Sequence, residues 1–254
     1  MRFFAATIIA SLLIPVQDVF AADASTKAVA EKMHLPVLLY HYVEQPSTKD
    51  AGRKAMTIAP SVLENQLKAL QGKQYETVFM RDIPTFLEGT KTPPKNPVAL
   101  TFDDGYEDFY TDAFPILKKY NVVATLYVIS SFIGKGGYLT SGELKDIIAS
   151  GLVEIGAHTV DHPHLSRHKT AEQRSEIVDS KKTLERDFGI DVDTFAYPYG
   201  DYDKRTITIV KDAGFTVAVT TNKGTRYSAN DILTIPRLHA GAFLGKNKWK
   251  TLAR

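Results

Sequence analysis

Short apolar runs alternate along the chain with longer stretches in which polar and apolar positions are mixed. The runs are rich in Val, Ile, Phe and Tyr and occupy residues 36–40, 98–102, 122–129, 152–157, 194–197, 215–220 and 233–236. Apolar runs of this length, bounded by polar segments, are typical of buried β-strands. We therefore predict about seven strands.

The stretches between these runs carry the signals of helices. Helices are predicted over residues 61–70, 140–151, 170–189 and 204–214. Thr140 with Glu143, and Thr170 with Gln173, match the capping box that opens a helix. Strands that alternate with helices favour a parallel sheet. We predict an α/β fold, a distorted (β/α) barrel of about seven strands, with an open doubly wound sheet as the alternative.

The N-terminal segment has the pattern of a secretory signal. A mostly apolar, uncharged run of about 14 residues follows Arg2, which is shorter than the roughly 20 residues that a membrane-spanning helix needs. We predict a signal peptide over residues 1–21, a flexible lead-in over 22–35 and one domain over 36–254. The protein is then secreted, whether periplasmic, extracellular or cell-surface associated, and no transmembrane segment is expected. An uncleaved N-terminal anchor is the alternative.

Composition narrows the possible chemistry. The chain contains no cysteine, which excludes disulfide bonds, thiolate metal ligands and a cysteine nucleophile. The formal net charge is only +2, and such a small charge gives no electrostatic bias toward nucleic acid or a membrane surface. No nucleic-acid partner is therefore expected.

Two carboxylates follow the apolar run 98–102. Asp103 and Asp104 stand where this predicted strand ends, and Gly105 allows a sharp turn after them. Functional residues of parallel α/β folds gather at the carboxyl ends of the strands. Two adjacent carboxylates repel each other, and a bound cation would stabilise one and leave the other free as a base. An ordinary Asp-Gly turn with solvated acids is the alternative.

Two histidines follow the run 152–157. His158 and His162 are four residues apart, and Pro163 disfavours helical geometry at His162. Imidazoles on such a turn can converge on one ion, and one carboxylate oxygen with two imidazoles suits zinc, with cobalt, nickel or iron possible. We therefore expect one divalent metal ion where this turn meets the Asp-Asp turn.

A third element follows the strand that begins at Thr194. The sequence Phe195-Ala-Tyr-Pro-Tyr-Gly200 offers aromatic rings that could wall a sugar pocket, from Tyr197, Pro198, Tyr199 and Gly200. Its irregular backbone could also present the Tyr199 N–H to a developing oxyanion. A strand that ends in a Pro-Gly turn is the simpler alternative.

In combination these elements resemble the polysaccharide deacetylase family, the NodB-homology domain of carbohydrate esterase family 4. The resemblance rests on Thr-Phe-Asp-Asp-Gly, His-Thr-x-x-His-Pro-x-Leu and Tyr-Pro-Tyr-Gly, in this order, over roughly residues 98–240. It implies that Asp104, His158 and His162 are the ligands of one divalent metal and that Asp103 is the general base. Tyr199 corresponds to the residue whose amide helps to hold the oxyanion.

The chain departs from the family pattern in two places. Family members commonly have an Arg in the third motif that orients the base, where this chain has Ala196. The late Leu-x-His motif, which supplies the general acid, is matched only by Leu238-His239 near the end of the chain. His239 is therefore a second candidate for the acid and for substrate binding.

His41 is the stronger candidate for the acid. It ends the first predicted strand in Pro36-Val-Leu-Leu-Tyr-His-Tyr42. This stretch is similar to the subgroup that deacetylates poly-β-1,6-N-acetylglucosamine, in which circular permutation moves the last motif to the front. By that resemblance His41 protonates the leaving amine.

The resemblance implies a metal-dependent hydrolase that removes N-acetyl groups from an N-acetylglucosamine polymer, with the poly-β-1,6-linked polymer as the first candidate. One alternative keeps the chemistry and changes the substrate to peptidoglycan, chitin oligomers or an O-acetylated glycan. Another is a non-catalytic glycan-binding protein of the same fold, which Ala196 motivates. The expected partner is an extracellular or cell-envelope polysaccharide, and the sequence identifies no partner in an export machinery.

Overall fold

The computed structural model describes residues 32–45, 50–243 and 252. The predicted signal peptide and residues 22–31 of the predicted lead-in lie outside the described residues. The last residues of that lead-in belong to the fold, because β1 (Met33–His34) pairs antiparallel with β11 (Arg226–Tyr227). Within the described part of the chain, no helix combines the length and the apolar character needed to cross a membrane.

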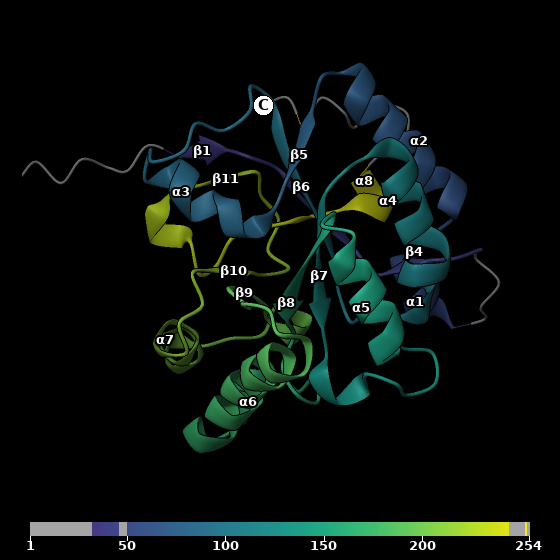
Figure 1. Ribbon diagram of the computed structural model, residues 1–254. Coiled ribbons are helices and arrows are strands. Elements are labelled where there is room, and N and C mark those ends of the chain that lie inside the picture. The colour runs from purple at the N-terminus through teal and green to yellow at the C-terminus, as the bar shows by residue number, and fades with distance from the viewer. Residues whose placement is uncertain (1–31, 46–49, 244–251, 253–254) are drawn as a thin grey trace, which may run out of the picture.

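A curled parallel sheet forms the centre of the molecule (Figure 1). Its strands lie in the order β10-β9-β8-β7-β6-β2-β12, and β5 also pairs with β6. They are β2 (Val37–Tyr40), β5 (Glu76–Val78), β6 (Pro97–Phe102), β7 (Ala124–Val128), β8 (Val153–Ala157), β9 (Thr194–Ala196), β10 (Val217–Val219) and β12 (Leu238–His239). Every pairing in this sheet is parallel. The carboxyl ends of the strands therefore share one edge.

Side chains alternate between the two faces of each strand and form two hydrophobic clusters. The larger one, with Leu38, Leu100 and Phe102, packs under the surrounding helices. The smaller one includes Ala99 and Tyr127 and fills the inside of the curl. Both faces of the sheet are thus buried, as expected for a parallel sheet that is covered by helices.

Residues 235–239 join the two edges of the sheet. Ile235 forms a parallel bridge with Val219 of β10, and β12 then pairs with β2 at the opposite edge. The chain crosses from one edge to the other within a few residues and closes the curl. The predicted distorted (β/α) barrel is confirmed, and the open doubly wound alternative is wrong.

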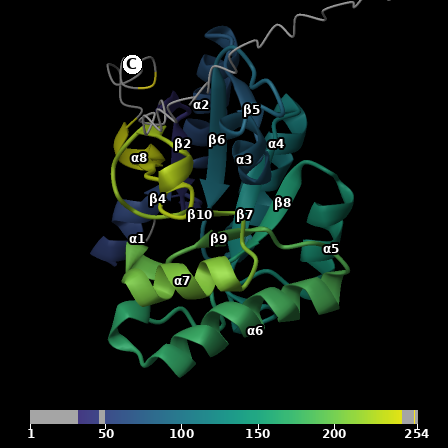
Figure 2. The same cartoon turned by 90° about the vertical axis from the view of Figure 1, so that its left-hand side faces the viewer.

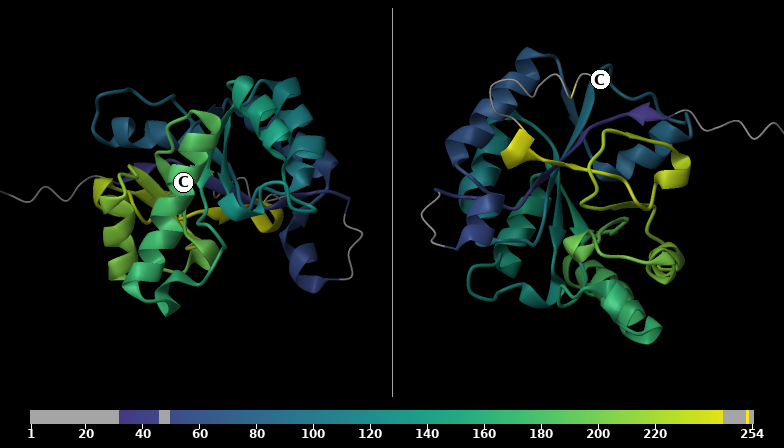
Figure 3. Two further views of the ribbon diagram at one scale, coloured as in Figure 1. Left: turned by 60° about the horizontal axis from the view of Figure 1, so that its bottom comes forward. Right: turned by 180° about the vertical axis from the view of Figure 1, so that it is seen from behind.

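The helices lie around the outside of the barrel (Figures 1 and 3). They are α1 (Ala51–Met56), α2 (Pro60–Gly72), α3 (Ile83–Leu87), α4 (Phe114–Tyr120), α5 (Ser141–Ala149), α6 (Thr170–Phe188), α7 (Lys204–Asp212) and α8 (Ala240–Phe243). Figure 2 shows α6 and α7 side by side near the carboxyl ends of the strands. A short parallel pair, β3 (Tyr42–Val43) with β4 (Thr57–Ile58), extends the loop after β2.

Several local predictions can be compared with the structure. The capping box of Thr140 and Glu143 is confirmed at the start of α5. The box predicted for Thr170 and Gln173 is wrong by one residue, because Glu172 caps the N–H of Lys169 and Gln173 is buried. The run 233–236 forms only a bridge at Ile235. The short elements β5, α3 and α4 were missed.

Candidate active site

A cavity of about 430 Å³ opens at the carboxyl ends of the strands. Most of the residues predicted to be functional line it, although they come from turns far apart in the sequence. Its walls are formed by His41, Met56, Asp103, Asp104, Tyr106, Ile129, Phe132, Tyr138, His158, Asp161, His162, Tyr199, Thr221 and His239. This location agrees with the rule that sites of parallel α/β folds form where the strands end.

The Asp-Asp turn leaves β6 abruptly. Asp104 has φ 77° and Gly105 has φ 75°, so two consecutive residues adopt the left-handed conformation. Gly105 tolerates this conformation because it has no Cβ. Both carboxylates are buried, with Asp103 only 3% and Asp104 only 6% exposed. Two buried acids side by side need cationic partners.

The histidine turn after β8 is also irregular. Thr159 has φ 65° and His162 has φ 59°, so His162 is non-helical, as the following proline predicts. Glu176 on α6 accepts the N–H groups of Val160 and Asp161 at 3.0 and 2.9 Å. The hydroxyl of Thr159 accepts the N–H of His162 at 3.0 Å. These bonds offset the strain of the turn and hold His162 in place.

Three side chains converge as metal ligands would. Oδ1 of Asp104 lies 3.2 Å from Nε2 of His158 and 3.4 Å from Nε2 of His162. Ligand atoms at tetrahedral angles and about 2.0–2.1 Å from a zinc ion are about 3.3 Å apart. Oδ1 is also buried without a hydrogen-bond partner among the described residues. The three residues therefore fit one divalent cation, and no other such group occurs in the described part of the chain.

The protonation of the two imidazoles suits this role. Nδ1 of His158 lies 2.7 Å from the carbonyl oxygen of Ala196; a carbonyl only accepts, so Nδ1 carries the proton and Nε2 is free to bind a metal. Burial and the neighbouring His158 lower the pKa of His162 to about 4. Burial opposes the charge on His158, but the carboxylates of Asp104 and Asp103 together with the Ala196 carbonyl outweigh burial and raise the pKa of His158. A cation between these groups would replace that proton.

Asp103 has a cationic partner that the sequence did not predict. Arg237 donates from Nη1 to Oδ1 and from Nη2 to Oδ2 of Asp103, both at 2.7 Å. Arg237 is 0% exposed. Burial alone would raise the pKa of Asp103, but the guanidinium outweighs burial and holds the pKa below its usual value. Asp103 is therefore ionised near neutral pH.

Both candidate acids lie at the cavity. His41 follows β2 and His239 ends β12, and since these strands are neighbours, their imidazoles stack with centroids 6.4 Å apart and 6° between planes. Burial lowers the pKa of both imidazoles, and at His41 the carboxylates of Asp103 and Asp104 oppose the shift. The structure brings both histidines together with the carboxylates.

The third motif contributes one residue to the cavity rather than four. Tyr199 is 56% exposed, and its backbone has φ 59°. Its ring stacks on the imidazole of His164, with ring centroids 4.0 Å apart. Tyr197, in contrast, is fully buried and donates its hydroxyl to the carbonyl of Leu233. Pro198 and Gly200 do not line the cavity either. These three residues lie outside the cavity lining and form the turn that presents Tyr199.

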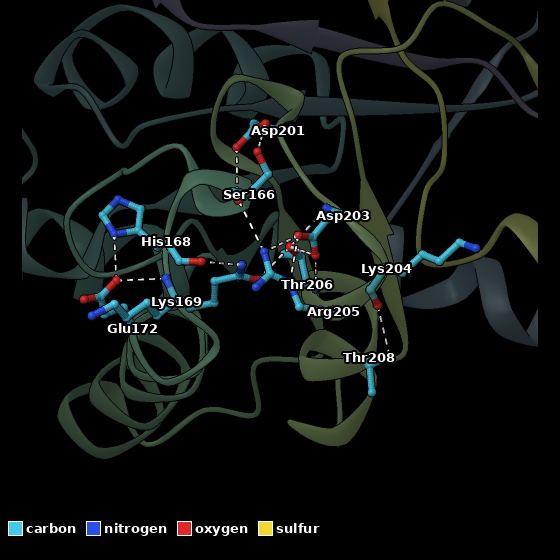
Figure 4. A network of polar contacts seen from close by, with 11 residues as sticks. Ser166, His168, Lys169, Glu172, Asp201, Asp203, Lys204, Arg205, Thr206 and Thr208 are labelled. Carbon is cyan, nitrogen blue, oxygen red and sulfur yellow. Dashed lines mark hydrogen bonds and ion pairs between the residues drawn. The ribbon is translucent and has the colours of Figure 1, made fainter.

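A polar network ties this turn to the histidine turn (Figure 4). The carboxylate of Asp201 accepts the N–H of Ser166 at 2.8 Å and its hydroxyl at 2.7 Å. Arg205 on α7 donates to Asp203 and to the carbonyl of Ser166. The loops after β8 and β9 are therefore held together next to the turn that carries Tyr199.

Aromatic side chains also line the cavity, and the sequence analysis did not predict them. Tyr106 stacks between Tyr42 and Tyr138, with centroids 3.9 and 5.1 Å apart, and Phe132 packs edge-on against Tyr138 at 4.8 Å. Apolar, aromatic walls with a few converging polar groups are typical of small-molecule and sugar sites. Tyr106 follows Gly105 directly, and that proximity was the one available signal.

A parallel barrel that carries an Asp-His-His group fit for one divalent cation, with a buried acid beside it at the carboxyl ends of the strands, has the groups that metal-assisted hydrolysis needs. Comparison with protein families identifies it further: residues 90–218 match the model of the polysaccharide deacetylases. YxkH of Bacillus subtilis, which is assigned to the polysaccharide deacetylases, is 31% identical over 87% of this chain and 79% of that protein. The chain belongs to the polysaccharide deacetylase family.

Two further proteins are similar to this chain, one in sequence and one in structure. The poly-β-1,6-N-acetyl-D-glucosamine N-deacetylase of Staphylococcus aureus is 30% identical over 63% of this chain, and the match spans 60% of the length of that enzyme. The deacetylase PplD of Streptococcus pyogenes, solved in complex with acetate, has a TM-score of 0.80 at 29% identity, over 87% of this chain and 99% of that one. Both the fold and the deacetylase activity follow from these likenesses.

Proposed function

We propose that this protein is a secreted, metal-dependent N-deacetylase of poly-β-1,6-N-acetylglucosamine. The observation that carries the proposal is the convergence of Asp104, His158 and His162, with Asp103 beside them, on one cavity. The likeness to the staphylococcal enzyme supports the choice of polymer. The apolar N-terminal segment over residues 1–21 supports secretion.

Asp104, His158 and His162 would hold the metal, with zinc as the first candidate and cobalt, nickel or iron as alternatives. A bound divalent cation polarises a carbonyl and lowers the pKa of a water molecule. Asp103, ionised next to Arg237, accepts the proton of the attacking water. The N–H of Tyr199 donates a hydrogen bond to the oxyanion that forms on the acetyl carbonyl. His41 donates a proton to the departing amine, so that acetate and a free amino sugar result.

The lining of the cavity supports a neutral substrate. It contains the acids Asp103, Asp104 and Asp161 but, among the described residues, no Lys or Arg. An anionic glycan that carries carboxylates or phosphates would find no Lys or Arg side chain on this described lining to pair with. The exposed ring of Tyr199 offers an apolar face on which a sugar ring can stack.

The test is acetate release from β-1,6-linked and β-1,4-linked N-acetylglucosamine oligomers, with and without a chelator. We expect the wild type to prefer the β-1,6 linkage, the chelator to stop the reaction, and zinc or cobalt to restore it. Asp103→Asn is expected to lower kcat by about 10²–10⁴-fold. Equal rates on both linkages would contradict the polymer assignment, and full activity in chelator would contradict the role of the metal.

A further inference from the structure

We propose that Arg237 is the residue that positions the general base, in place of the arginine that the family places in its third motif. The proposal rests on the proposed role of Asp103. Its basis is the bidentate contact between Arg237 and Asp103, which bridges 134 positions of the sequence with two bonds of 2.7 Å.

Four hydrogen bonds fix the guanidinium. Besides its two bonds to Asp103, Nε donates to the carbonyl of Thr220 at 2.8 Å, and Nη1 donates to the hydroxyl of Thr101 at 3.1 Å. The Tyr127 ring lies beside the guanidinium, 5.9 Å from centroid to Cζ. Arg237 is also the largest fully buried side chain in the described structure. The four bonds and the burial of both residues therefore hold the guanidinium and the Asp103 carboxylate in one relative orientation.

The closing segment of the barrel makes this contact possible. Arg237 lies between Ile235, which bridges to β10, and β12, which pairs with β2. Its N–H donates to the carbonyl of Asn222 at 2.7 Å. The segment crosses the gap between the two sheet edges, and the side chain reaches Asp103 at the end of β6. Ala196, the position of the family arginine, instead uses its carbonyl to orient His158.

The consequence for the reaction is geometric. A base works only if its acceptor oxygen is held within hydrogen-bond reach of the proton that it takes, and a misplacement of about 1 Å can cost about 10² in rate. The planar fork of Arg matches both carboxylate oxygens, whereas the ammonium of Lys supplies one point charge. Charge alone therefore does not replace the contact. The absence of an Arg at position 196 is no longer a reason to expect a non-catalytic protein.

The experiment is a double-mutant cycle on acetate release. It compares wild type, Arg237→Lys, Asp103→Asn and the double variant, on β-1,6-linked oligomers and on 4-nitrophenyl acetate, whose hydrolysis does not depend on the polymer. We expect Arg237→Lys to lower kcat by about 10–100-fold, with KM and cobalt affinity changed less than about threefold. In the Asp103→Asn background, the same substitution should change the residual rate by less than about threefold.

A second, milder variant keeps the test possible if Arg237→Lys does not fold. Thr101→Val removes one acceptor of the guanidinium, and Thr125→Val, its register neighbour on β7, is the matched control because Thr125 bonds to Glu154 instead. We expect Thr101→Val to lower kcat several-fold more than Thr125→Val does, with cobalt affinity unchanged in both.

The outcomes separate the two proposals. An inactive wild type would overturn the proposed function. An active wild type with unchanged kcat in Arg237→Lys, or equal losses in both Asp103 backgrounds, would overturn the positioning role alone. If Arg237→Lys fails to fold, equal kcat in Thr101→Val and Thr125→Val would overturn it.

Discussion

Two histidines of the site are candidates for the one general acid that the proposed reaction needs. His41 and His239 stack in parallel on neighbouring strands, and both line the cavity. They differ in surroundings: the carboxylates of both Asp103 and Asp104 act on His41, whereas of these two only Asp103 acts on His239. The proton donor must reach the leaving amine of the same acetyl group that the base and the metal ligands act on, so it has to lie near both Asp103 and Asp104. This favours His41.

We predict unequal effects for the two imidazoles. His41→Gln should lower kcat by about 10²–10⁴-fold, because the amine leaves without a proton donor, and leave cobalt affinity near the wild-type value. His239→Gln should lower kcat by less than about 10-fold. The measurements are acetate release and a cobalt titration of each variant. A larger loss in His239→Gln than in His41→Gln would assign the acid to His239.

At the scale of single elements, helix α6 supports the proposed metal site without contributing a proposed ligand. Glu176 accepts two N–H groups of the turn that carries His162, and the carbonyl groups of Thr159 and Val160 accept the N–H groups of Ser130 and Ser131 after β7. The turn is thus held from two sides. Residues that orient metal ligands in this way affect metal affinity nearly as much as the ligands do.

Glu176→Ala should therefore weaken metal binding. We expect a 10–100-fold loss of zinc or cobalt affinity, the usual range for a residue that orients a ligand. Asp179→Ala, one turn further along the same helix and exposed, is the matched control and should leave the affinity unchanged. Isothermal titration of the metal-free protein measures both. Equal affinities in the two variants would mean that the turn holds His162 without α6.

Inside the barrel, Gly156 on β8 leaves space for the ring of Tyr127. The two residues are register partners on adjacent strands, and a Cβ at Gly156 would lie 2.4 Å from Cδ1 of Tyr127. The Tyr127 ring in turn lies beside the guanidinium of Arg237. The glycine therefore sets the depth at which the ring and the guanidinium pack.

Gly156→Ala should lower both stability and activity. We expect a loss of about 1–3 kcal/mol in the free energy of unfolding from overpacking, and a lower kcat because the ring is pushed toward Arg237. Gly72→Ala, at the end of α2 with no heavy atom within 4 Å of the added Cβ, is the control and should be neutral or stabilising. Urea unfolding and acetate release measure the two effects. A neutral Gly156→Ala would show that Tyr127 can move freely.

At the scale of the whole molecule, the barrel interior holds two separate groups of buried charged residues. One group is the Arg237–Asp103 pair at the carboxyl ends of the strands. The other is Glu154 on β8, which is buried and whose carboxylate accepts a hydrogen bond from the Thr125 hydroxyl at 2.8 Å. Burial raises the pKa of Glu154 to about 7, although its hydrogen bonds and Arg81 act in the opposite direction. The folded protein thus favours the protonated form of this acid.

The raised pKa makes folding stability depend on pH. The unfolded chain ionises Glu154 near pH 4.5, its ordinary value, whereas the folded protein keeps the proton until about pH 7. Stability from this group is therefore fully present below pH 4.5 and falls as the pH rises to 7. Glu154→Gln should flatten this decline in urea unfolding measured at pH 5, 6 and 7. Glu76→Gln, an exposed control, should keep the wild-type slope, and an unchanged slope in Glu154→Gln would contradict the prediction.

The sequence by itself determined the barrel class and the three turns of the site. A strand followed by Asp-Asp-Gly, or by two histidines and a proline, is a local pattern, and the parallel fold brings all such turns to one edge. These patterns placed both carboxylates and both histidines near strand ends, and the resemblance to the polysaccharide deacetylases then assigned Asp104, His158 and His162 as the metal ligands. The exact start of α6 and the short elements β5, α3 and α4 gave no comparable local signal.

Only the tertiary structure decided which groups complete the site. Arg237 reaches Asp103 across 134 positions, and the contact depends on how residues 235–239 close the sheet. Tyr197 and Tyr199 are two residues apart and look alike in sequence, yet one is buried and the other exposed, because φ is 59° at Tyr199. Local patterns specify where strands end. Partners across the barrel depend on packing, which sequence spacing does not contain.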